Sequence, residues 1–298
     1  MVRAAAPNPQ AGKSDRPSQR NLDAELSRLQ SIPEMWKWVA QREDVSHHLA
    51  LHDPHARPAI KITYADLYQN MQQFAAGLQA LGVAESDRVA LFADNSPRWL
   101  IADQGIMMAG AIDAVRGAQA ERGELLFILS DSGSTALVVE NQALLKTLLP
   151  ELTTLPIQLI VLLTDETPDA IDGIKLLNFT QLLELGAQHD LKPATPGRDT
   201  LATLMYTSGT SGTPKGVMLS HGNLLSQITG ARAVVQLNPG EKVLSILPIW
   251  HCYERTFEYF IFAQGCTQIY TNIRHVKKDL KEFQPSYMVA VPRLWESI

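Results

Sequence analysis

The feature that most restricts the fold of this sequence is a repeated alternation of short apolar runs with helical patterns. The apolar runs are nearly continuous, as in strands buried on both faces of a parallel sheet. We predict strands at Val89–Ala93, Leu137–Glu140, Gln158–Leu163, Leu201–Thr207, Val217–Leu219, Val243–Leu247, Gln268–Tyr270 and Tyr287–Val291. Strand–helix alternation of this kind predicts an α/β layered fold with a parallel sheet.

Helical patterns fill the intervals between these runs. The clearest begins after Thr63, because apolar residues recur every three or four positions from Leu67 to Leu81. Asp66 follows Thr63 at the spacing of a capping box, and Gly82 supplies a stop. Further helices are predicted to start at Ile32 and Pro292 and to span Pro97–Gly110, Gln142–Leu149, Phe179–Gln188, His221–Val235, Tyr253–Ala263 and Lys277–Phe283.

The ends of the chain differ in character from its middle. Residues 1–30 are rich in Ala, Pro, Ser, Gln and Arg, so we expect a disordered tail there, and its acidic residues argue against a transit peptide. Residues 31–298 are expected to form one large, partial domain, with a linker-like segment near 190–199 that holds two prolines and a glycine. The chain stops at Ile298 inside a predicted helix, without a helix-ending signal, so we expect a truncated fragment.

Composition restricts the setting of the protein. The net charge of -5 gives no electrostatic case for nucleic acid, which usually requires a basic face. The chain has only two cysteines, Cys252 and Cys266, which are interpreted as small semi-buried hydrophobes in a reducing compartment. No apolar run approaches the roughly 20 residues that span a bilayer, and the first thirty residues lack the apolar core of a signal peptide, so we expect no secretory signal. We therefore predict a cytoplasmic protein.

The segment Tyr206–Gly216 (YTSGTSGTPKG) has the composition of a phosphate-binding loop. Glycines let backbone N–H groups approach an anion, and successive N–H groups form an anion-binding concavity. Hydroxyl side chains donate to phosphate oxygens, and a lysine supplies a mobile charge. The predicted ATP phosphate-binding residues are Thr207, Ser208, Gly209, Thr210, Ser211, Gly212, Thr213, Lys215 and Gly216.

This loop differs from the Walker type. The Walker pattern requires a glycine five residues after Gly209, where Pro214 stands, and it leads from a strand into a helix. Here the strand-like residues Val217–Leu219 follow the loop. A flexible linker or a simple hairpin turn is the structural alternative, but linkers rarely hold a proline–lysine pair between two hydrophobic strands.

At these residues a family resemblance becomes visible. The segment from Tyr206 to Asn223 resembles the phosphate-binding signature of adenylate-forming enzymes, the superfamily of acyl-CoA synthetases, luciferases and peptide-synthetase adenylation domains. The resemblance implies the layered N-terminal domain of such an enzyme, with ATP and Mg²⁺ as cofactors. It also implies that the loop holds the β- and γ-phosphates while a substrate carboxylate attacks the α-phosphate.

A second stretch narrows the substrate. Leu247–Arg255 (LPIWHCYER) resembles a segment of long-chain acyl-CoA and acyl-carrier-protein synthetases, and the Glu–Arg pair points away from luciferases and peptide synthetases. The resemblance extends from Thr63 to the end, with Ala111–Gly117 in the form found in acyl-carrier-protein synthetases. It implies His251 as a catalytic residue. The predicted substrate-side residues are Trp250, His251, Glu254 and Arg255, the last two as an ion pair that fixes the helix.

Two functions from different classes follow. The first is an acid–thiol ligase that activates a long-chain fatty acid and passes it to CoA or acyl carrier protein. Because the family's adenine-binding and ribose-binding motifs and its small C-terminal domain do not occur in this chain, we expect the chain to be inactive alone. The second is a non-catalytic fragment that binds nucleotide or a partner. The acceptor, the acyl chain length and the oligomeric state stay open.

Two further clusters received weaker interpretations. His48 and His52 would share a helical face that Pro54 ends before His55, and no carboxylate or cysteine completes a tetrahedral set, so no metal site is predicted. Arg274, Lys277, Lys278 and Lys281 form a basic stretch. We interpret it as a solvated helix face, with docking of an acidic carrier protein or peripheral membrane association as the alternative.

Overall fold

The structure, a computed structural model, describes residues 19–167, 169–207 and 213–296. The chain divides into two compact units, the first formed by residues 1–66 and 224–298 and the second by residues 67–223. The two boundaries fall inside helices α3 (Tyr64–Ala80) and α8 (His221–Arg232). Each unit contains its own sheet.

The second unit contains a seven-stranded sheet in the order β7-β6-β5-β3-β4-β8-β9. All neighbouring strands are parallel except β8 and β9, which are antiparallel. The strands are β3 (Arg88–Phe92), β4 (Ile112–Arg116), β5 (Ala136–Val139), β6 (Leu159–Leu162), β7 (Lys175–Asn178), β8 (Leu201–Thr207) and β9 (Lys215–Ser220). Its remaining helices are α4 (Pro97–Met108), α5 (Arg122–Ser132), α6 (Gln142–Leu152) and α7 (Phe179–Ala187).

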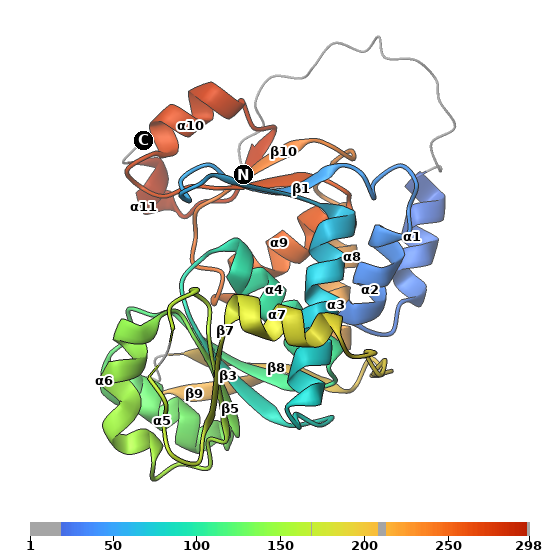
Figure 1. Cartoon of the computed structure of the whole chain (residues 1–298). Helices are drawn as coiled ribbons and strands as arrows, with labels where there is room; N and C mark the ends of the chain where they lie inside the picture. The colour runs from blue at the N-terminus through green and yellow to red at the C-terminus, as the bar shows by residue number, and fades with distance from the viewer. Residues whose placement is uncertain (1–18, 168, 208–212, 297–298) are drawn as a thin grey trace. The chain divides into compact units, whose positions relative to one another are not determined.

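Helices cover both faces of this sheet, as Figure 1 shows, with α5 and α6 on one side and α3, α4 and α7 on the other. Every residue of β5 and β6 is buried, which explains their uninterrupted apolar sequences. Alternate residues face opposite layers, and Phe92, Val139 and Leu162 pack in one cluster with residues of α5 and α6. Burial of apolar surface at about 25 cal/mol per Å² is the main force that holds these layers.

Local capping sets the helix starts. Ser96 accepts a hydrogen bond from Trp99 N and precedes Pro97, which lies in the first turn of α4. Asn178 forms a full capping box with Gln181 at the start of α7. At α3, Asp66 N donates to Thr63 Oγ1, while the Asp66 carboxylate bonds the Thr63 hydroxyl rather than its backbone.

The first unit contains a five-stranded sheet in the order β12-β10-β11-β1-β2, parallel except for the β1–β2 pair. Its strands are β1 (Leu49–Asp53), β2 (Ile60–Thr63), β10 (Lys242–Ser245), β11 (Thr267–Tyr270) and β12 (Tyr287–Met288). Its helices are α1 (Gln19–Arg28), α2 (Ile32–Ala40), α9 (Cys252–Ala263), α10 (Val276–Phe283) and α11 (Pro292–Trp295). Trp36, Tyr64 and Phe262 meet in its core, with the rings of Trp36 and Phe262 5.0 Å apart.

The predicted strands and helices are all present, with boundaries that differ by a few residues, and the α/β fold with parallel sheets is confirmed. The patterns missed β1, β2, β4, α5 and β7. Helix α1 lies inside the range where we expected a disordered tail, because the apolar residues Leu26 and Leu29 are buried. Residues 1–18 are outside the described residues. Cys252 is exposed, against the semi-buried position expected.

Candidate functional site

The predicted phosphate loop connects the last two strands of the seven-stranded sheet. In the antiparallel β8–β9 pair, Thr207 lies opposite Lys215, so the two strands form a β-hairpin whose connected end is at these two residues. Because β8 also runs parallel to β4, this end coincides with the carboxyl ends of the parallel strands. Ligands of open α/β sheets bind at that edge. The two predicted strands are confirmed, and residues 208–212 between them lie outside the described residues.

The structure describes part of the predicted phosphate-binding set. The residues outside the described ranges are Ser208, Gly209, Thr210, Ser211 and Gly212. The residues that are described, all of them exposed, are Thr207, Thr213, Lys215 and Gly216. Within the described part of the chain, Lys215 has no acidic partner, so its ammonium group is available to an anion.

Tyr206 fixes the base of the hairpin. Its side chain is buried, and its hydroxyl donates a hydrogen bond of 2.7 Å to Asp131 Oδ2 of α5. Burial and the neighbouring carboxylate both raise the pKa of the Tyr206 hydroxyl, so it stays protonated as a donor. A Cβ atom on Gly216 would lie 3.1 Å from Tyr206 Cζ. Packing against Tyr206 therefore favours glycine at 216, besides the predicted approach of phosphate.

The residues directly after the hairpin begin α8. Ser220 N donates to Asn223 Oδ1 at 3.0 Å, and Asn223 N donates to Ser220 Oγ at 3.2 Å, a reciprocal cap. His221 lies between them and is 3% exposed. Burial lowers the pKa of His221 to about 4, so the ring is neutral at pH 7.

The segment near 190–199, which we expected to resemble a linker, is held at both ends by the second unit. Lys192 N donates to Gln79 Oε1 at 3.0 Å, and Gln79 Nε2 donates to Lys192 O at 2.9 Å. At its other end, Gly222 N donates to Arg198 O at 2.7 Å. A Cβ atom on Gly222 would lie 2.8 Å from that carbonyl oxygen, so the close approach requires glycine.

The second predicted segment, residues 247–255, belongs to the first unit, starts between β10 and α9 and continues into the first turn of α9. His251 is exposed and directly precedes α9, and its backbone N–H donates to Pro248 O at 3.0 Å. The rings of Trp250 and His251 are 4.3 Å apart at an interplanar angle of 35°. The pair thus combines an aromatic ring with an exposed imidazole.

Glu254 and Arg255 lie in the first turn of α9, and both are buried. Glu254 Oε1 accepts a hydrogen bond of 2.5 Å from Ser245 Oγ, and burial raises the pKa of Glu254 to about 8. Arg255 Nε donates to the Tyr259 hydroxyl at 2.8 Å. These contacts differ from the expected ion pair between the two residues, because consecutive helix positions do not face each other.

The loop and the His251 segment belong to different units. The expected contact of His251 with the loop, and the roles of Trp250 and His251 toward a substrate, therefore stay predictions.

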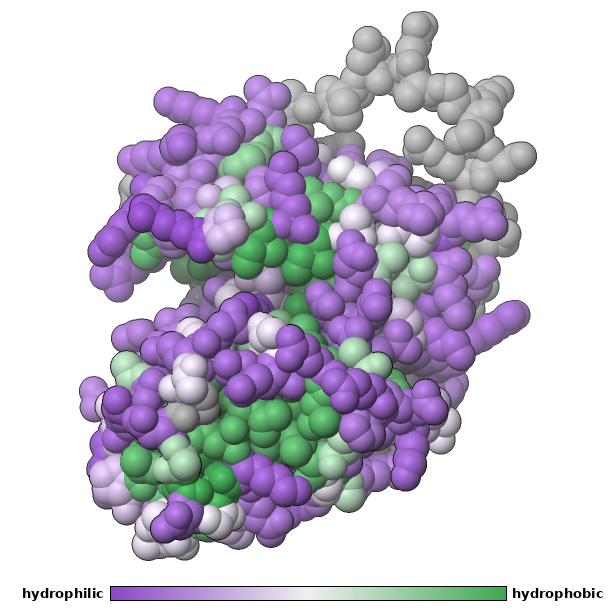
Figure 2. Space-filling view, viewed as in Figure 1, coloured by the Kyte–Doolittle hydropathy of each residue, from purple (hydrophilic) through white to green (hydrophobic). Residues whose placement is uncertain are grey.

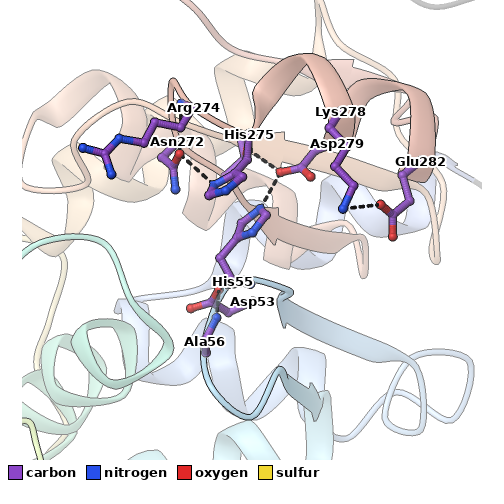
Figure 3. A network of polar contacts seen from close by, with 10 residues as sticks. Asp53, His55, Ala56, Asn272, Arg274, His275, Lys278, Asp279 and Glu282 are labelled. Atoms are coloured by element: carbon purple, nitrogen blue, oxygen red, sulfur yellow. Dashed lines mark hydrogen bonds and ion pairs between the residues drawn. The ribbon is translucent and has the colours of Figure 1, made fainter.

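One residue of the predicted histidine cluster, His55, belongs to a network of polar contacts. His52 lies in strand β1, so the helical face expected for His48 and His52 was wrong. As Figure 3 shows, His55 Nε2 lies 2.7 Å from Asp279 Oδ2, and its ring stacks on His275 at 4.0 Å. Thr271 Oγ1 also donates to Asp279 Oδ2, at 2.5 Å. The network joins the β1–β2 turn to α10.

The basic stretch lies at and just before α10. Arg274, Lys277, Lys278 and Lys281 are exposed, and Lys278 pairs with Glu282 at 3.6 Å. In Figure 2 the surface over α10 is mainly hydrophilic, in agreement with a solvated face. Among the helices that the structure describes, none is long and apolar enough to cross a membrane.

Sequence reasoning missed three residues at these sites. Asp131 lies 75 positions from Tyr206, and no spacing rule connects them. Ser245 is the last residue of an apolar strand, where a hydroxyl gives no separate signal. The sequence pattern identified His221 only as the first residue of a helix. The predicted start of that helix directly after a strand is the signal that could have indicated a buried His221.

Comparison with known proteins adds to this geometry. Residues 37–298 match the family model described as AMP-binding enzyme. The chain is 39% identical over 287 residues to the long-chain-fatty-acid–[acyl-carrier-protein] ligase AEE15, chloroplastic, of Arabidopsis thaliana, covering 91% of this chain and 39% of that protein. It is 31% identical over 247 residues to the long-chain-fatty-acid–CoA ligase FadD15 of Mycobacterium tuberculosis, covering 80% of this chain and 40% of that protein. The chain thus spans about two fifths of the length of these curated relatives.

Solved structures share the fold. The N-terminal domain of FACL13 from Mycobacterium tuberculosis matches with a TM-score of 0.73 and 23% identity, covering 90% of this chain and 64% of that one. The long-chain-fatty-acid-CoA ligase FadD1 from Archaeoglobus fulgidus matches with a TM-score of 0.76 and 18% identity, covering 90% and 52%. At these identities the likeness concerns the fold alone, and it confirms the predicted fold class.

Proposed function

This chain belongs to the AMP-binding enzyme family, and on that premise we propose that it holds the phosphates of ATP during the activation of a long-chain fatty acid. The observation that carries the proposal is the β8–β9 hairpin. Its exposed hydroxyl residues and Lys215, which has no acidic partner among the residues that the structure describes, lie at the carboxyl edge of a parallel sheet, on a base fixed by Tyr206. The names of the relatives support a fatty acid as the acid substrate.

The proposed reaction has two steps. In the first, a carboxylate oxygen of the fatty acid bonds to the α-phosphorus of ATP, the bond from that phosphorus to the bridging oxygen breaks, and pyrophosphate leaves. In the second, a thiol sulfur bonds to the acyl carbon, AMP leaves, and the thiol proton passes to solvent. Lys215 and the loop N–H groups would stabilise the negative charge that grows on pyrophosphate. His251 would act beside the acyl carboxylate.

The donor chemistry at the loop fits magnesium that arrives with ATP. Mg²⁺ keeps several waters and takes ligands from phosphates and one or two carboxylates, rather than from an all-protein cage. Over residues 19–167, 169–207 and 213–296, no group of three His, Cys, Asp or Glu side chains could hold a metal ion. The exposed hydroxyls of Thr207 and Thr213 suit metal-bound water and phosphate oxygens. Bound with ATP, the ion would neutralise phosphate charge.

The acceptor thiol is either CoA or acyl carrier protein. The Arabidopsis relative is named for the carrier protein and the mycobacterial relative for CoA. We favour acyl carrier protein as the acceptor because identity to the first is higher. Since the chain spans about two fifths of either relative, we propose that completion of both steps requires residues outside it. The cytoplasmic location stays a prediction, because the Arabidopsis relative carries a chloroplastic name.

Exchange of labelled pyrophosphate into ATP tests the first step in the intact gene product. We expect exchange that depends on added long-chain fatty acid. Binding of ATP without any exchange would favour the alternative, a non-catalytic nucleotide-binding protein, and would overturn the ligase. Comparing CoA with acyl carrier protein as acceptor, at equal concentration, then identifies the thiol. Faster thioester formation with CoA would overturn our preference for the carrier protein.

A further inference from the structure

The segment that carries Trp250 and His251 has little regular structure of its own. It leaves β10 after Ser245 and enters α9 at Cys252. Ile249 in its middle is buried, and the segment is attached to regular structure at both ends. Ser245 is buried at the strand end, and Glu254 is 2% exposed in the first turn of the helix.

One side chain joins these two ends. Glu254 Oε1 accepts a hydrogen bond of 2.5 Å from Ser245 Oγ. The backbone N–H of Ile246, the first residue of the connection, also donates to the Glu254 carboxyl group. Both bonds close the segment into a loop, with Trp250 and His251 between the two attachment points. Hydrogen bonds in so buried a setting are strong, and their loss leaves buried donors unsatisfied.

We propose that Glu254 is a positioning residue. The neutral, protonated side chain of Glu254 holds the Trp250–His251 segment in place, and ionisation of Glu254 releases the segment. The inference rests on the proposed function, in which this segment meets the fatty acid. Glu254 Oε2 is buried and has no hydrogen-bond partner among the described residues. A carboxylate would therefore leave half of its charge without a donor.

The neighbouring polar side chains of α9 are buried as well. On the next turn of α9, buried Glu258 accepts hydrogen bonds from Gln268 Nε2 at 2.5 Å and from the Tyr270 hydroxyl at 2.8 Å, both from β11. The adjacent Arg255 turns its Nε toward Tyr259. Burial raises the pKa of Glu254 to about 8, even though the bonds from Ser245 and Ile246 favour the charged form. Ionisation therefore falls just above neutral pH.

Hydrogen–deuterium exchange of the intact gene product tests this inference. Peptides that cover residues 246–251 are compared between wild type and Glu254→Gln at matched pH, from about pH 6.5 to about pH 9.5, which covers the change from mostly neutral to mostly ionised Glu254. The matched control is Glu282→Gln, an exposed glutamate on α10. We expect the wild-type to E254Q exchange ratio to rise about tenfold across this range. The ratio of wild type to E282Q should stay constant.

Ser245→Ala provides a second variant if E254Q does not fold. Removing a donor to the carboxylate disfavours the charged form, so the alkaline transition should move to higher pH. A purely structural contact would instead raise exchange equally at every pH. A constant wild-type to E254Q ratio, or an unmoved transition in S245A, would overturn the inference.

The substrate readout separates this inference from the proposed function. In pyrophosphate exchange, the wild-type KM for fatty acid should rise across the same pH range while the KM for ATP stays level, and E254Q should lack that rise. If no variant catalyses exchange, the proposed function fails, while hydrogen–deuterium exchange still decides the role of Glu254. An equal rise of the KM values for fatty acid and for ATP would contradict a role of Glu254 that is confined to fatty-acid binding.

Discussion

The β8–β9 hairpin and the β10–α9 segment are both expected to contact substrates, but different kinds of contact hold them in place. The hairpin extends from a seven-stranded sheet with apolar layers on both faces, and the neutral ring of His221 is buried at its end. The β10–α9 segment is tied by buried polar bonds of Glu254. Burial lowers the pKa of His221 to about 4 and raises that of Glu254 to about 8.

The two groups therefore respond to pH in opposite directions. For His221 the folded pKa lies below the ordinary 6.5, so its contribution to stability is present above pH 6.5 and is lost as pH falls toward about 4. For Glu254 the folded pKa lies above the ordinary 4.5, so its contribution is present below pH 4.5 and is lost as pH rises toward about 8.

Replacing Lys215 should give the largest effect, because it removes the cation without disturbing the sheet. We expect Lys215→Ala to lower fatty-acid-dependent pyrophosphate exchange by about 10²-fold or more, as for loss of one preorganised charge-stabilising group. The control is Lys146→Ala, an exposed lysine on α6 whose pairing with Asp169 at 3.8 Å is weak. Equal activity of K215A and K146A would contradict a role of Lys215 in pyrophosphate exchange.

The loss of unfolding free energy at acid pH tests the role of the buried His221 at the end of the hairpin. The shift of the His221 pKa from 6.5 to about 4 corresponds to about 3 kcal/mol of unfolding free energy lost between these pH values. His221→Gln, which cannot titrate, should show less of this loss in denaturant melts. The exposed His189 serves as control through His189→Gln. The same acid sensitivity in H221Q and wild type would contradict the assignment.

Gly216 tests whether the hairpin depends on packing against Tyr206. Gly216→Ala should lower the free energy of unfolding by about 1–3 kcal/mol, the usual range for overpacking. In a Tyr206→Ala background the loss should shrink, since the ring that the new methyl group meets is gone. Gly123→Ala on α5 has no neighbour within 4 Å and should be neutral or slightly stabilising. Additive losses in the double variant would contradict direct contact.

The basic face at α10 should give the smallest effect. If it is a solvated face, the charge reversals Lys277→Glu and Lys281→Glu together should change thioester formation by less than about twofold with either acceptor, as for exposed charges in general. A large loss with acyl carrier protein and none with CoA would instead support docking of an acidic carrier. A loss of binding to anionic vesicles would support a membrane surface.

The sequence predicted these two regions unequally, for physical reasons. The hairpin was predictable because apolar strands and a glycine-rich loop have local signatures that hold wherever they pack. Two of the missed strands lacked such local signatures. Strand β4 carries buried Asp113 inside its apolar run, and β1 contains His52 and ends at Asp53. The Glu254–Ser245 bond could not be predicted, because it depends on the approach of a helix to a strand end, and charge adjacency suggested Arg255 instead.

The transfer of labelled oxygen tests the central claim most directly. Turnover of a long-chain fatty acid with both carboxylate oxygens labelled with ¹⁸O, followed by mass spectrometry of the nucleotide products, reports which phosphorus the carboxylate attacks. The account predicts that AMP gains one labelled oxygen and that pyrophosphate carries none. Label in inorganic phosphate with formation of ADP would show attack at the γ-phosphorus, and unlabelled products would show no acyl–phosphate intermediate, either of which would contradict the account.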